Sequence, residues 1–215
     1  MTVKAKICGI NDPQALDAAV ANGASFVGFV FYARSPRYVT PSAAGALARQ
    51  TPPGIMRVGL FVDVEDAAIE AILRDAPLDM LQFHGAESPE RIRATKIRLG
   101  LPVMKAIKIA SAADLDQADR FLDSADWLLF DAKVPSTMTG ALPGGNALAF
   151  DWKILSGARF TCPWMLSGGL TGANVAEAVR ISGAQAVDVS SGVEDRPGHK
   201  DPQRIADFLG IVRSL

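Results

Sequence analysis

Cys8 is the residue of this chain best placed to do chemistry. It follows a short apolar run and precedes Gly9, so it stands where a first strand should end and a loop begin. A thiol at such a place can act as a nucleophile or, once ionised, as a base, because the thiolate is the reactive form. Taken alone, however, Cys8 fits a small core residue better, since free cysteine is among the most buried residue types.

Asp131 is a second candidate, because it follows the apolar run 127–130. The segment after it, residues 132–148, contains several prolines and glycines and little helical pattern. A loop of that length inside a compact domain is usually a lid or a binding loop. If such a lid excludes water, the pKa of Asp131 should rise and the carboxyl could serve as a general acid. The alternative is a helix cap or turn residue.

Two segments rich in glycine and serine suggest an anion site. Gly168 and Gly169 follow one predicted strand, and Ser190, Ser191 and Gly192 follow the next. Backbone N–H groups beside glycine can approach a phosphate closely. Either segment alone fits a tight turn equally well. Together they indicate phosphate binding, because the loops after the last two strands of an eight-stranded α/β barrel commonly hold phosphate.

Further polar residues lie at neighbouring strand ends. Arg37 stands in a second long loop, where it is either exposed to solvent or binds a carboxylate through two N–H groups of its guanidinium. Gln82 and His84 share one face of a strand, and that face would point into the mouth of a barrel. His84 could contact a ligand there, or could equally be a core histidine whose ring nitrogens are hydrogen-bonded within the protein. An inward-facing Lys6 needs a partner, for which Asp188 is the candidate.

Composition limits the class of protein. The chain has 215 residues, 49% of them hydrophobic and 21% charged, and a net charge of -1. These values predict a soluble globular protein without the broad basic surface that binds nucleic acid. No apolar stretch approaches the roughly 18 residues that span a membrane, and no secretory signal precedes the first strand, so we expect a cytoplasmic protein. With two cysteines and two histidines, we expect neither a disulfide framework nor a bound metal.

Eight short apolar runs alternate with eight alanine-rich segments of helical period, which is the pattern of repeated βαβ units. The predicted strands lie at residues 3–8, 25–31, 56–62, 79–83, 102–108, 126–131, 163–167 and 185–190. The predicted helices lie at residues 13–22, 41–50, 64–75, 88–98, 111–122, 149–156, 172–182 and 202–212. Eight such pairs favour a (β/α)8 barrel, formed as a single domain over residues 1–215. A doubly wound open sheet is the alternative, but no glycine-rich nucleotide motif follows the first strand.

The barrel prediction places the chemistry at one rim. Barrel enzymes carry their active sites at the C-terminal ends of the strands, where Cys8, Asp131 and the glycine segments should meet. Cys162 begins a strand at the opposite end, and this geometry disfavours a disulfide between Cys8 and Cys162. The shared rim therefore favours catalysis over packing for Cys8.

Helix starts are marked by a capping side chain ahead of a proline at Asp12, Ser88 and Asp201.

Five motifs stand at the ends of predicted strands. They are Lys6-Ile7-Cys8-Gly9-Ile10, Gly28-Phe29-Val30-Phe31 with Ser35-Pro36-Arg37-Tyr38-Val39, Leu81-Gln82-Phe83-His84-Gly85, Leu166-Ser167-Gly168-Gly169-Leu170, and Val187-Asp188-Val189-Ser190-Ser191-Gly192-Val193-Glu194. In this order they resemble the phosphoribosylanthranilate isomerase family of tryptophan biosynthesis. The resemblance runs from residue 4 to residue 201 and includes the closing segment 197–201.

The resemblance implies an Amadori rearrangement of N-(5-phosphoribosyl)anthranilate to 1-(2-carboxyphenylamino)-1-deoxyribulose 5-phosphate, without a cofactor. It implies that Asp131 is the general acid and Cys8 the general base, and the pKa of Cys8 should then fall. Arg37 matches the position that contacts the anthranilate carboxylate, and Asp188 matches a polar position beside the substrate. We expect His84 and Gln82 to contact the substrate as well.

The lid departs from the family pattern. The family often has Gly-Gly-Thr/Ser-Gly ahead of Phe-Asp-Trp, whereas this chain has Gly144-Gly145-Asn146-Ala147, which leaves the exact phosphate contacts open. Two alternatives remain from the residues: another phosphate-binding barrel isomerase or epimerase, and a catalytically silent barrel that binds a sugar phosphate. The first would use paired carboxylates or a metal, and the second would need neither a thiol base nor an acid. The sequence leaves open a monomer or a homodimer, a rate-limiting lid, and activity on other sugar phosphates.

Overall fold

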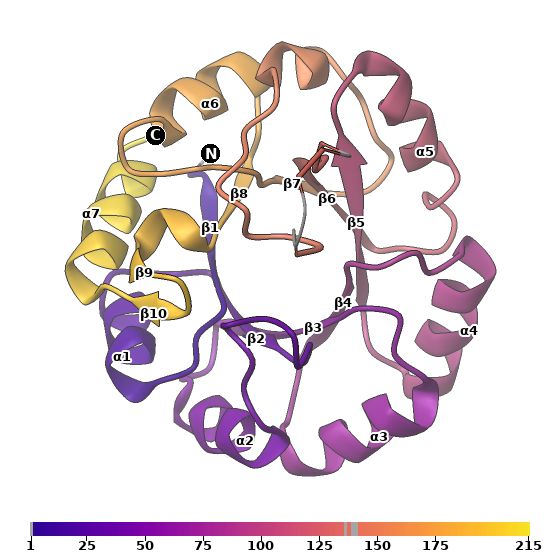
Figure 1. Cartoon of the computed structure of the whole chain (residues 1–215), viewed down its shortest axis with the longest axis vertical. Helices are drawn as coiled ribbons and strands as arrows, with labels where there is room; N and C mark the ends of the chain where they lie inside the picture. Colours follow the sequence, from indigo (N-terminus) through magenta and orange to yellow (C-terminus); the bar gives the residue numbers. More distant parts are fainter. Residues whose placement is uncertain (1, 136, 139–141) are drawn as a thin grey trace.

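Eight parallel strands close into a barrel in sequence order, and helices surround it (Figure 1). The computed structural model describes residues 2–135, 137–138 and 142–215. The strands are β1 (Lys4–Cys8), β2 (Phe26–Val30), β3 (Met56–Phe61), β4 (Met80–Phe83), β5 (Val103–Ile109), β6 (Trp127–Ala132), β7 (Trp164–Leu166) and β8 (Ala186–Val189). The barrel closes where β1 pairs with β8, with Lys6 opposite Asp188. The predicted (β/α)8 barrel is confirmed.

The surrounding α-helices are α1 (Pro13–Ala21), α2 (Pro41–Gln50), α3 (Asp66–Asp75), α4 (Pro89–Leu99), α5 (Asp116–Asp119), α6 (Val175–Ser182) and α7 (Pro202–Arg213). Short 3-10 helices are η1 (Ala112–Leu115), η2 (Trp152–Leu155) and η3 (Ser191–Val193). The three predicted helix starts are confirmed, since the side chains of Asp12, Ser88 and Asp201 each accept a backbone N–H from the first turn.

Two predicted helices are shorter than expected. The segment 111–122 divides into η1 and α5, because the Asp114 carboxylate accepts the N–H groups of Ala110 and Ser111 and tightens the turn. The segment 149–156 forms only η2, which the Asp151 side chain caps and which Gly157, at φ +75°, follows. The repeat pattern predicted eight full helices because it registers apolar spacing and not these local side-chain bonds.

A hairpin after β8 was not predicted. It consists of β9 (Glu194–Arg196) and β10 (His199–Lys200), which pair antiparallel. Strands of two and three residues are too short for the alternation that marks a strand in a sequence. Gly198, at φ +82°, turns the hairpin beside Pro36, whose carbonyl oxygen lies 2.2 Å from where a Cβ of residue 198 would be. The hairpin therefore contacts the loop after β2.

The barrel interior changes from apolar to polar along its axis. An apolar cluster fills the N-terminal part of the barrel and consists of Phe26, Val58, Met80, Met104, Ala106, Leu129, Met165 and Ala186. One layer nearer the C-terminal rim, Lys6, Gln82 and Asp188 are also buried. These polar groups adjoin the apolar cluster, where water does not screen their charges, so Lys6 and Asp188 need oppositely charged or hydrogen-bonding partners.

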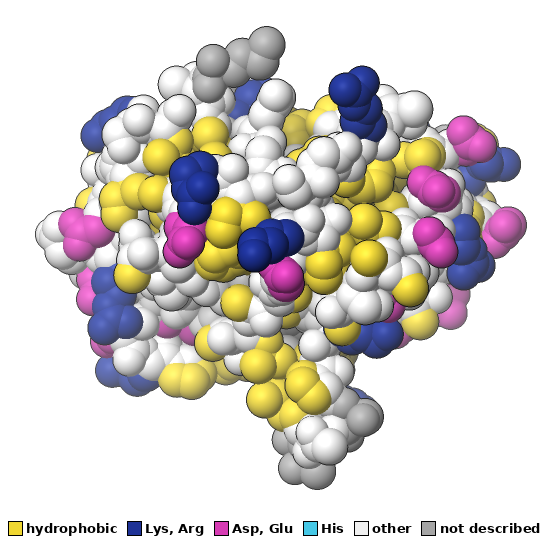
Figure 2. Space-filling view, turned by 90° about the horizontal axis from the view of Figure 1, so that it is seen from above, with side chains coloured by type: hydrophobic (Ala, Val, Ile, Leu, Met, Phe, Trp, Pro, Cys, Tyr) yellow, Lys and Arg dark blue, Asp and Glu magenta, His cyan; other side chains and the backbone are white. Residues whose placement is uncertain are grey.

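The outer surface mixes charges of both signs. On the side shown in Figure 2, basic and acidic side chains are interspersed with apolar ones. Among the residues that the structure describes, no helix is long and apolar enough to cross a membrane.

Candidate active site

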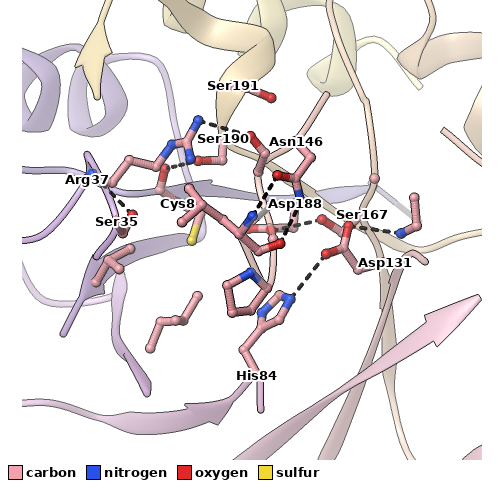
Figure 3. Close-up of a pocket in the computed structure, with 18 of the residues that line it drawn as sticks. Cys8, Ser35, Arg37, His84, Asp131, Asn146, Ser167, Asp188, Ser190 and Ser191 are labelled. Carbon is pink, nitrogen blue, oxygen red and sulfur yellow. Dashed lines mark hydrogen bonds and ion pairs between the residues drawn. The ribbon is translucent and has the colours of Figure 1, made fainter. Parts of the chain in front are cut away.

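A pocket lies at the C-terminal rim of the barrel, beneath the described part of the segment after β6. Nine of the residues proposed from the sequence line it: Cys8, Arg37, His84, Asp131, Gly168, Gly169, Asp188, Ser190 and Ser191. Figure 3 shows the labelled side chains converging on this pocket from separate strand ends. Residues 142–148 of the predicted lid also line it.

Two proposed residues, Gln82 and Gly192, lie beside the pocket and are not among the described residues that line it. Gln82 is fully buried, and its Nε2 donates to Nδ1 of His84 at 3.0 Å. Gly192 packs on the backbone, because a Cβ there would lie 1.9 Å from the carbonyl oxygen of Leu170. In this structure Gln82 orients His84, and Gly192 is required for close packing.

His84 and Asp131 form a buried pair. His84 Nε2 lies 3.1 Å from Asp131 Oδ2 (Figure 3). Since Nδ1 of His84 accepts from Gln82, the ring proton belongs on Nε2, which donates to the carboxylate. Burial, and then the charge of Lys108, lower the pKa of His84. A neutral imidazole therefore acts as a hydrogen-bond donor to Asp131.

Asp131 is held in its ionised form. Burial favours the neutral carboxyl, but the hydrogen bond from His84, the charge of Lys108 and the N–H of Ala132 outweigh it and lower the pKa of Asp131. The Lys108 ammonium lies 3.5 Å from Oδ2. The predicted rise of this pKa is wrong, because the sequence did not indicate that His84 and Lys108 both face the carboxylate.

Cys8 ends β1 beside a buried ion pair. Lys6, two residues earlier on the same strand, donates to Asp188 Oδ1 at 2.9 Å, and Ser167 Oγ donates to Asp188 Oδ2 at 3.1 Å. A Cβ on Gly28 of the neighbouring strand would lie 3.1 Å from both Cys8 Sγ and Lys6 Nζ. The missing side chain at Gly28 thus leaves the space in which the thiol and the ammonium approach each other.

The thiol of Cys8 is held in its neutral form. Burial raises the pKa of Cys8, and the nearby Asp188 raises it further, whereas Lys6 and Lys200 lower it. The predicted fall of this pKa is wrong, since desolvation outweighs the two cations. The pKa of Lys6 is raised, because Asp188 and the thiol more than offset its own burial. Lys6 is therefore a permanent positive charge below Cys8.

Arg37 is buried and already paired. Its Nε and Nη2 donate to Oε1 and Oε2 of Glu194 at 2.7 and 2.8 Å, and Nη2 also donates to the carbonyl oxygen of Gly145 at 3.2 Å. Lys200 donates to Glu194 Oε1 at 2.7 Å. Sequence reasoning missed Glu194 and Lys200 as neighbours of Arg37. Both stand in recognised motifs, but only the hairpin brings them to the loop after β2.

The described part of the lid lies directly on these groups. A Cβ on Gly144 would be 2.9 Å from His84 Nε2 and 3.2 Å from Asp131 Oδ2, and one on Gly145 would be 2.4 Å from Arg37 Nη1. Asn146 closes the turn by bonding both backbone groups of Leu142. The lid was predicted over residues 132–148, of which 136 and 139–141 lie outside the described residues. In Figure 1 the described residues 142–148 lie across the view of the barrel interior.

The glycines after β7 have a packing reason of their own. Gly168 and Gly169 have φ of +88° and +62°, the left-handed region that favours glycine. A Cβ on Gly169 would lie 2.8 Å from the carbonyl oxygen of Leu148. These glycines therefore let the end of the lid lie against the loop, while both also face the pocket.

Comparison with known proteins agrees with this architecture. The family profile described as N-(5'phosphoribosyl)anthranilate (PRA) isomerase matches residues 5–210. Proteins named N-(5'-phosphoribosyl)anthranilate isomerase are similar over nearly their whole length: that of Rhodospirillum centenum is 58% identical, with 100% of both chains covered, and that of Paramagnetospirillum magneticum is 54% identical, with 99% of this chain and 98% of the relative covered.

Solved structures give the same result. Phosphoribosyl anthranilate isomerase from Thermotoga maritima superposes with a TM-score of 0.88 at 35% identity, covering 99% of this chain and 100% of the other. A second structure, a phosphoribosyl anthranilate isomerase in complex with reduced 1-(o-carboxyphenylamino)-1-deoxyribulose 5-phosphate, superposes with a TM-score of 0.85 at 34% identity and the same coverage. The chain belongs to the phosphoribosylanthranilate isomerase family.

Proposed function

We propose that this chain, acting as one catalytic domain, isomerises N-(5'-phosphoribosyl)anthranilate to 1-(2-carboxyphenylamino)-1-deoxyribulose 5-phosphate with Asp131 as the acid and Cys8 as the base. The observation that carries the assignment is that one pocket holds a thiol above a buried cation and a carboxyl bonded to a neutral histidine. Family membership supports the substrate and the reaction.

The chemistry needs one proton donor and one proton acceptor. The protonated form of Asp131 gives its proton to the furanose ring oxygen, and the C1–O bond breaks to leave a Schiff base. The thiolate of Cys8 then removes the proton from C2, which gives an enolamine that tautomerises to the ketone. Each turnover thus leaves Asp131 without a proton and Cys8 with one, so a proton returns from Cys8 to Asp131 before the next turnover.

The surrounding groups set how much enzyme has the required ionisation. A raised pKa on Cys8 and a lowered pKa on Asp131 favour the thiol and the carboxylate, the reverse of the reactive pair. The reactive form is a minority species whose fraction is constant between the two pKa values. Lys6 stabilises the thiolate, and for this reason it belongs to the catalytic assembly.

Substrate binding uses the two other parts of the rim. The substrate phosphate is placed at the loops of Gly168–Gly169 and Ser190–Ser191, which face the pocket together. The anthranilate carboxylate is placed on Arg37, where it takes over the Nη2 hydrogen bond that Gly145 accepts. His84 and Asp188 line the same pocket.

Kinetics on two single variants test the assignment. Phosphoribosylanthranilate is generated in situ, and the loss of its fluorescence is followed after addition of the protein. Cys8→Ala and Asp131→Asn should each lower kcat on the order of a hundredfold or more, because each removes one proton-transfer partner. The matched control is Cys162→Ala, which removes the half-buried thiol at the far end of the barrel and should retain activity.

Circular dichroism establishes that each variant is folded. Wild-type turnover in either Cys8→Ala or Asp131→Asn contradicts the roles given to these residues. A folded wild-type protein that leaves the fluorescence unchanged would instead support a silent sugar-phosphate-binding barrel.

A further inference from the structure

Arg37 presents two edges that can each bind a carboxylate. Its side edge is made of Nε and Nη2, and its end edge is made of Nη1 and Nη2. Glu194 occupies the side edge through both of its oxygens, at 2.7 and 2.8 Å. The end edge faces the lid: a Cβ on Gly145 would lie 2.4 Å from Nη1, and the carbonyl oxygen of Gly145 accepts from Nη2. The side edge is thus taken by the protein, and the end edge is directed at the pocket.

Two further contacts fix the orientation of Arg37. Its aliphatic stem lies on Gly9, the residue after Cys8, since a Cβ at Gly9 would be 2.9 Å from Cδ of Arg37. Its backbone N–H donates to Ser35 Oγ at 3.1 Å. With Glu194 at the other side, the guanidinium has little freedom to rotate. A buried arginine whose guanidinium is paired with Glu194 and whose stem packs on Gly9 is pre-organised for a planar ligand.

Lys200 adds a second positive charge to this cluster. Its ammonium is almost fully buried and donates to Glu194 Oε1 at 2.7 Å and to the carbonyl oxygen of Ser190 at 3.0 Å. Burial favours neutral Glu194, but the hydrogen bond from Arg37 and the charge of Lys200 outweigh it and lower the pKa of Glu194. Burial lowers the pKa of Lys200, and the charge and hydrogen bond of Glu194 act against this. With Lys200 protonated, the cluster of Arg37, Glu194 and Lys200 carries one net positive charge.

That balance has a consequence for binding. A pair of Arg37 and Glu194 alone would be neutral and would offer a second carboxylate little attraction. Lys200 compensates Glu194 and leaves the charge of Arg37 available to an incoming anion, at a site where low dielectric strengthens the interaction. The hairpin β9–β10 supplies both residues, which gives this late segment a direct connection to the active site.

We propose that Glu194 and Lys200 are positioning residues for recognition of the substrate carboxylate: Glu194 fixes the direction of Arg37, and Lys200 keeps the site electropositive. The proposal rests on the role given to Arg37 above. A purely structural alternative would be a clamp that ties the hairpin to the loop after β2 and affects all ligands equally. The two differ in whether the effect depends on a carboxylate in the ligand.

A pair of stable ligands separates these alternatives. Reductive amination of ribose 5-phosphate with anthranilate, or with aniline, gives two arylamino ribitol phosphates that differ only by the carboxylate. Calorimetry measures the Kd of each, and the ratio of the two Kd values is the carboxylate selectivity. The wild-type protein should prefer the anthranilate ligand by about tenfold or more, as expected for a charge-assisted bidentate contact.

Glu194→Gln should reduce this selectivity to within about threefold of unity while the Kd of the aniline ligand stays near its wild-type value. Lys200→Met should also lower the selectivity, although Arg37 remains held. In kinetics, both variants should raise KM more than they lower kcat. Equal weakening of both ligands, or wild-type selectivity in a folded Glu194→Gln variant, overturns the proposal.

Glu87→Gln is the matched control, because Glu87 is a similarly buried carboxylate bonded to a buried lysine, Lys105, at 2.7 Å. It should lower stability without changing the selectivity. Arg37→Met separates failure of this inference from failure of the role of Arg37. If Arg37→Met keeps the wild-type selectivity, the carboxylate is bound elsewhere. If Arg37→Met loses it and Glu194→Gln does not, only the positioning role is wrong.

Discussion

The charge of Lys6 should control how readily Cys8 ionises. Since Lys6 Nζ and Cys8 Sγ both lie 3.1 Å from the same point beside Gly28, they are at most about 6 Å apart. At an effective dielectric of about 20, such a pair attracts by about 3 kcal/mol. Replacement of Lys6 with methionine should therefore lower the ratio of thiolate to thiol on the order of a hundredfold at fixed pH.

The titration of the Cys8 thiol measures this effect directly. In a Cys162→Ala background only Cys8 contributes, and its ionisation is followed by the ultraviolet absorbance of the thiolate and by the pH dependence of its alkylation by iodoacetamide. Lys6→Met should move both curves to higher pH. Curves that stay in place, or move to lower pH, would refute the claim that Lys6 stabilises the thiolate.

Variants of Asp188 provide a comparison in the opposite direction. Asp188 raises the pKa of Cys8, so Asp188→Asn should move the titration to lower pH. Lys6→Met leaves Asp188 buried without its cation, a change that can cost about 3–5 kcal/mol of stability. The double variant removes both charges and avoids that penalty. Lys6 affects the pKa of the Cys8 thiol more strongly than Asp188 does. The Cys8 thiol of the double variant should therefore still titrate at a higher pH than that of the wild-type protein.

Four further outcomes are expected. The profile of kcat/KM against pH should stay level up to the raised pKa of Cys8 and fall beyond it, and a decline that begins near neutrality contradicts the reversed ionisation. Gly144→Ala should raise KM roughly fivefold or more, because its methyl group would overlap His84; an unchanged KM would show that the lid tip leaves this position freely. Ala147→Gly should raise the free energy of unfolding by about 0.5 kcal/mol in a denaturant titration, since residue 147 has φ +55°. Asp114→Asn should lower the free energy of unfolding by about 1 kcal/mol at neutral pH. This difference should disappear as the pH falls from about 4 through the pKa of Asp114 at about 2, because below that pH the wild-type carboxyl is protonated in both the folded and the unfolded state.

The strands and the functional rim could be predicted because both follow from local pattern. Runs of alternating or continuous apolar residues define the strands, and the direction of parallel strands puts their C-terminal ends together. Cys8 and Asp131 were assigned to one pocket on this basis, and both line it. The pairing of Lys6 with Asp188 followed from the same parity argument and is confirmed by the 2.9 Å contact.

Contacts that depend on tertiary detail could not be predicted. The partner of Arg37 is 157 residues away in the chain and stands on a hairpin with strands too short to give a pattern. Gln82 shares a strand face with His84, but its side chain bonds to the imidazole below the pocket and does not reach the pocket. Which way a side chain turns at the rim is decided by packing and hydrogen bonds and not by sequence period.

The two pKa predictions failed for a common reason that bears on the mechanism. The rise for Asp131 was argued from excluded solvent alone, and the fall for Cys8 from the base role that the resemblance implies, whereas each group is surrounded by several charges. A substrate that carries a carboxylate and a phosphate brings new negative charge to the rim, and negative charge favours the protonated carboxyl. If the substrate binds at Arg37 and at the glycine loops as proposed, its negative charge favours the acid form of Asp131. The same charge disfavours the thiolate of Cys8, as the nearby Asp188 already does. The substrate can therefore supply only half of the required ionisation, and the other half, the thiolate, depends on the positive charge of Lys6.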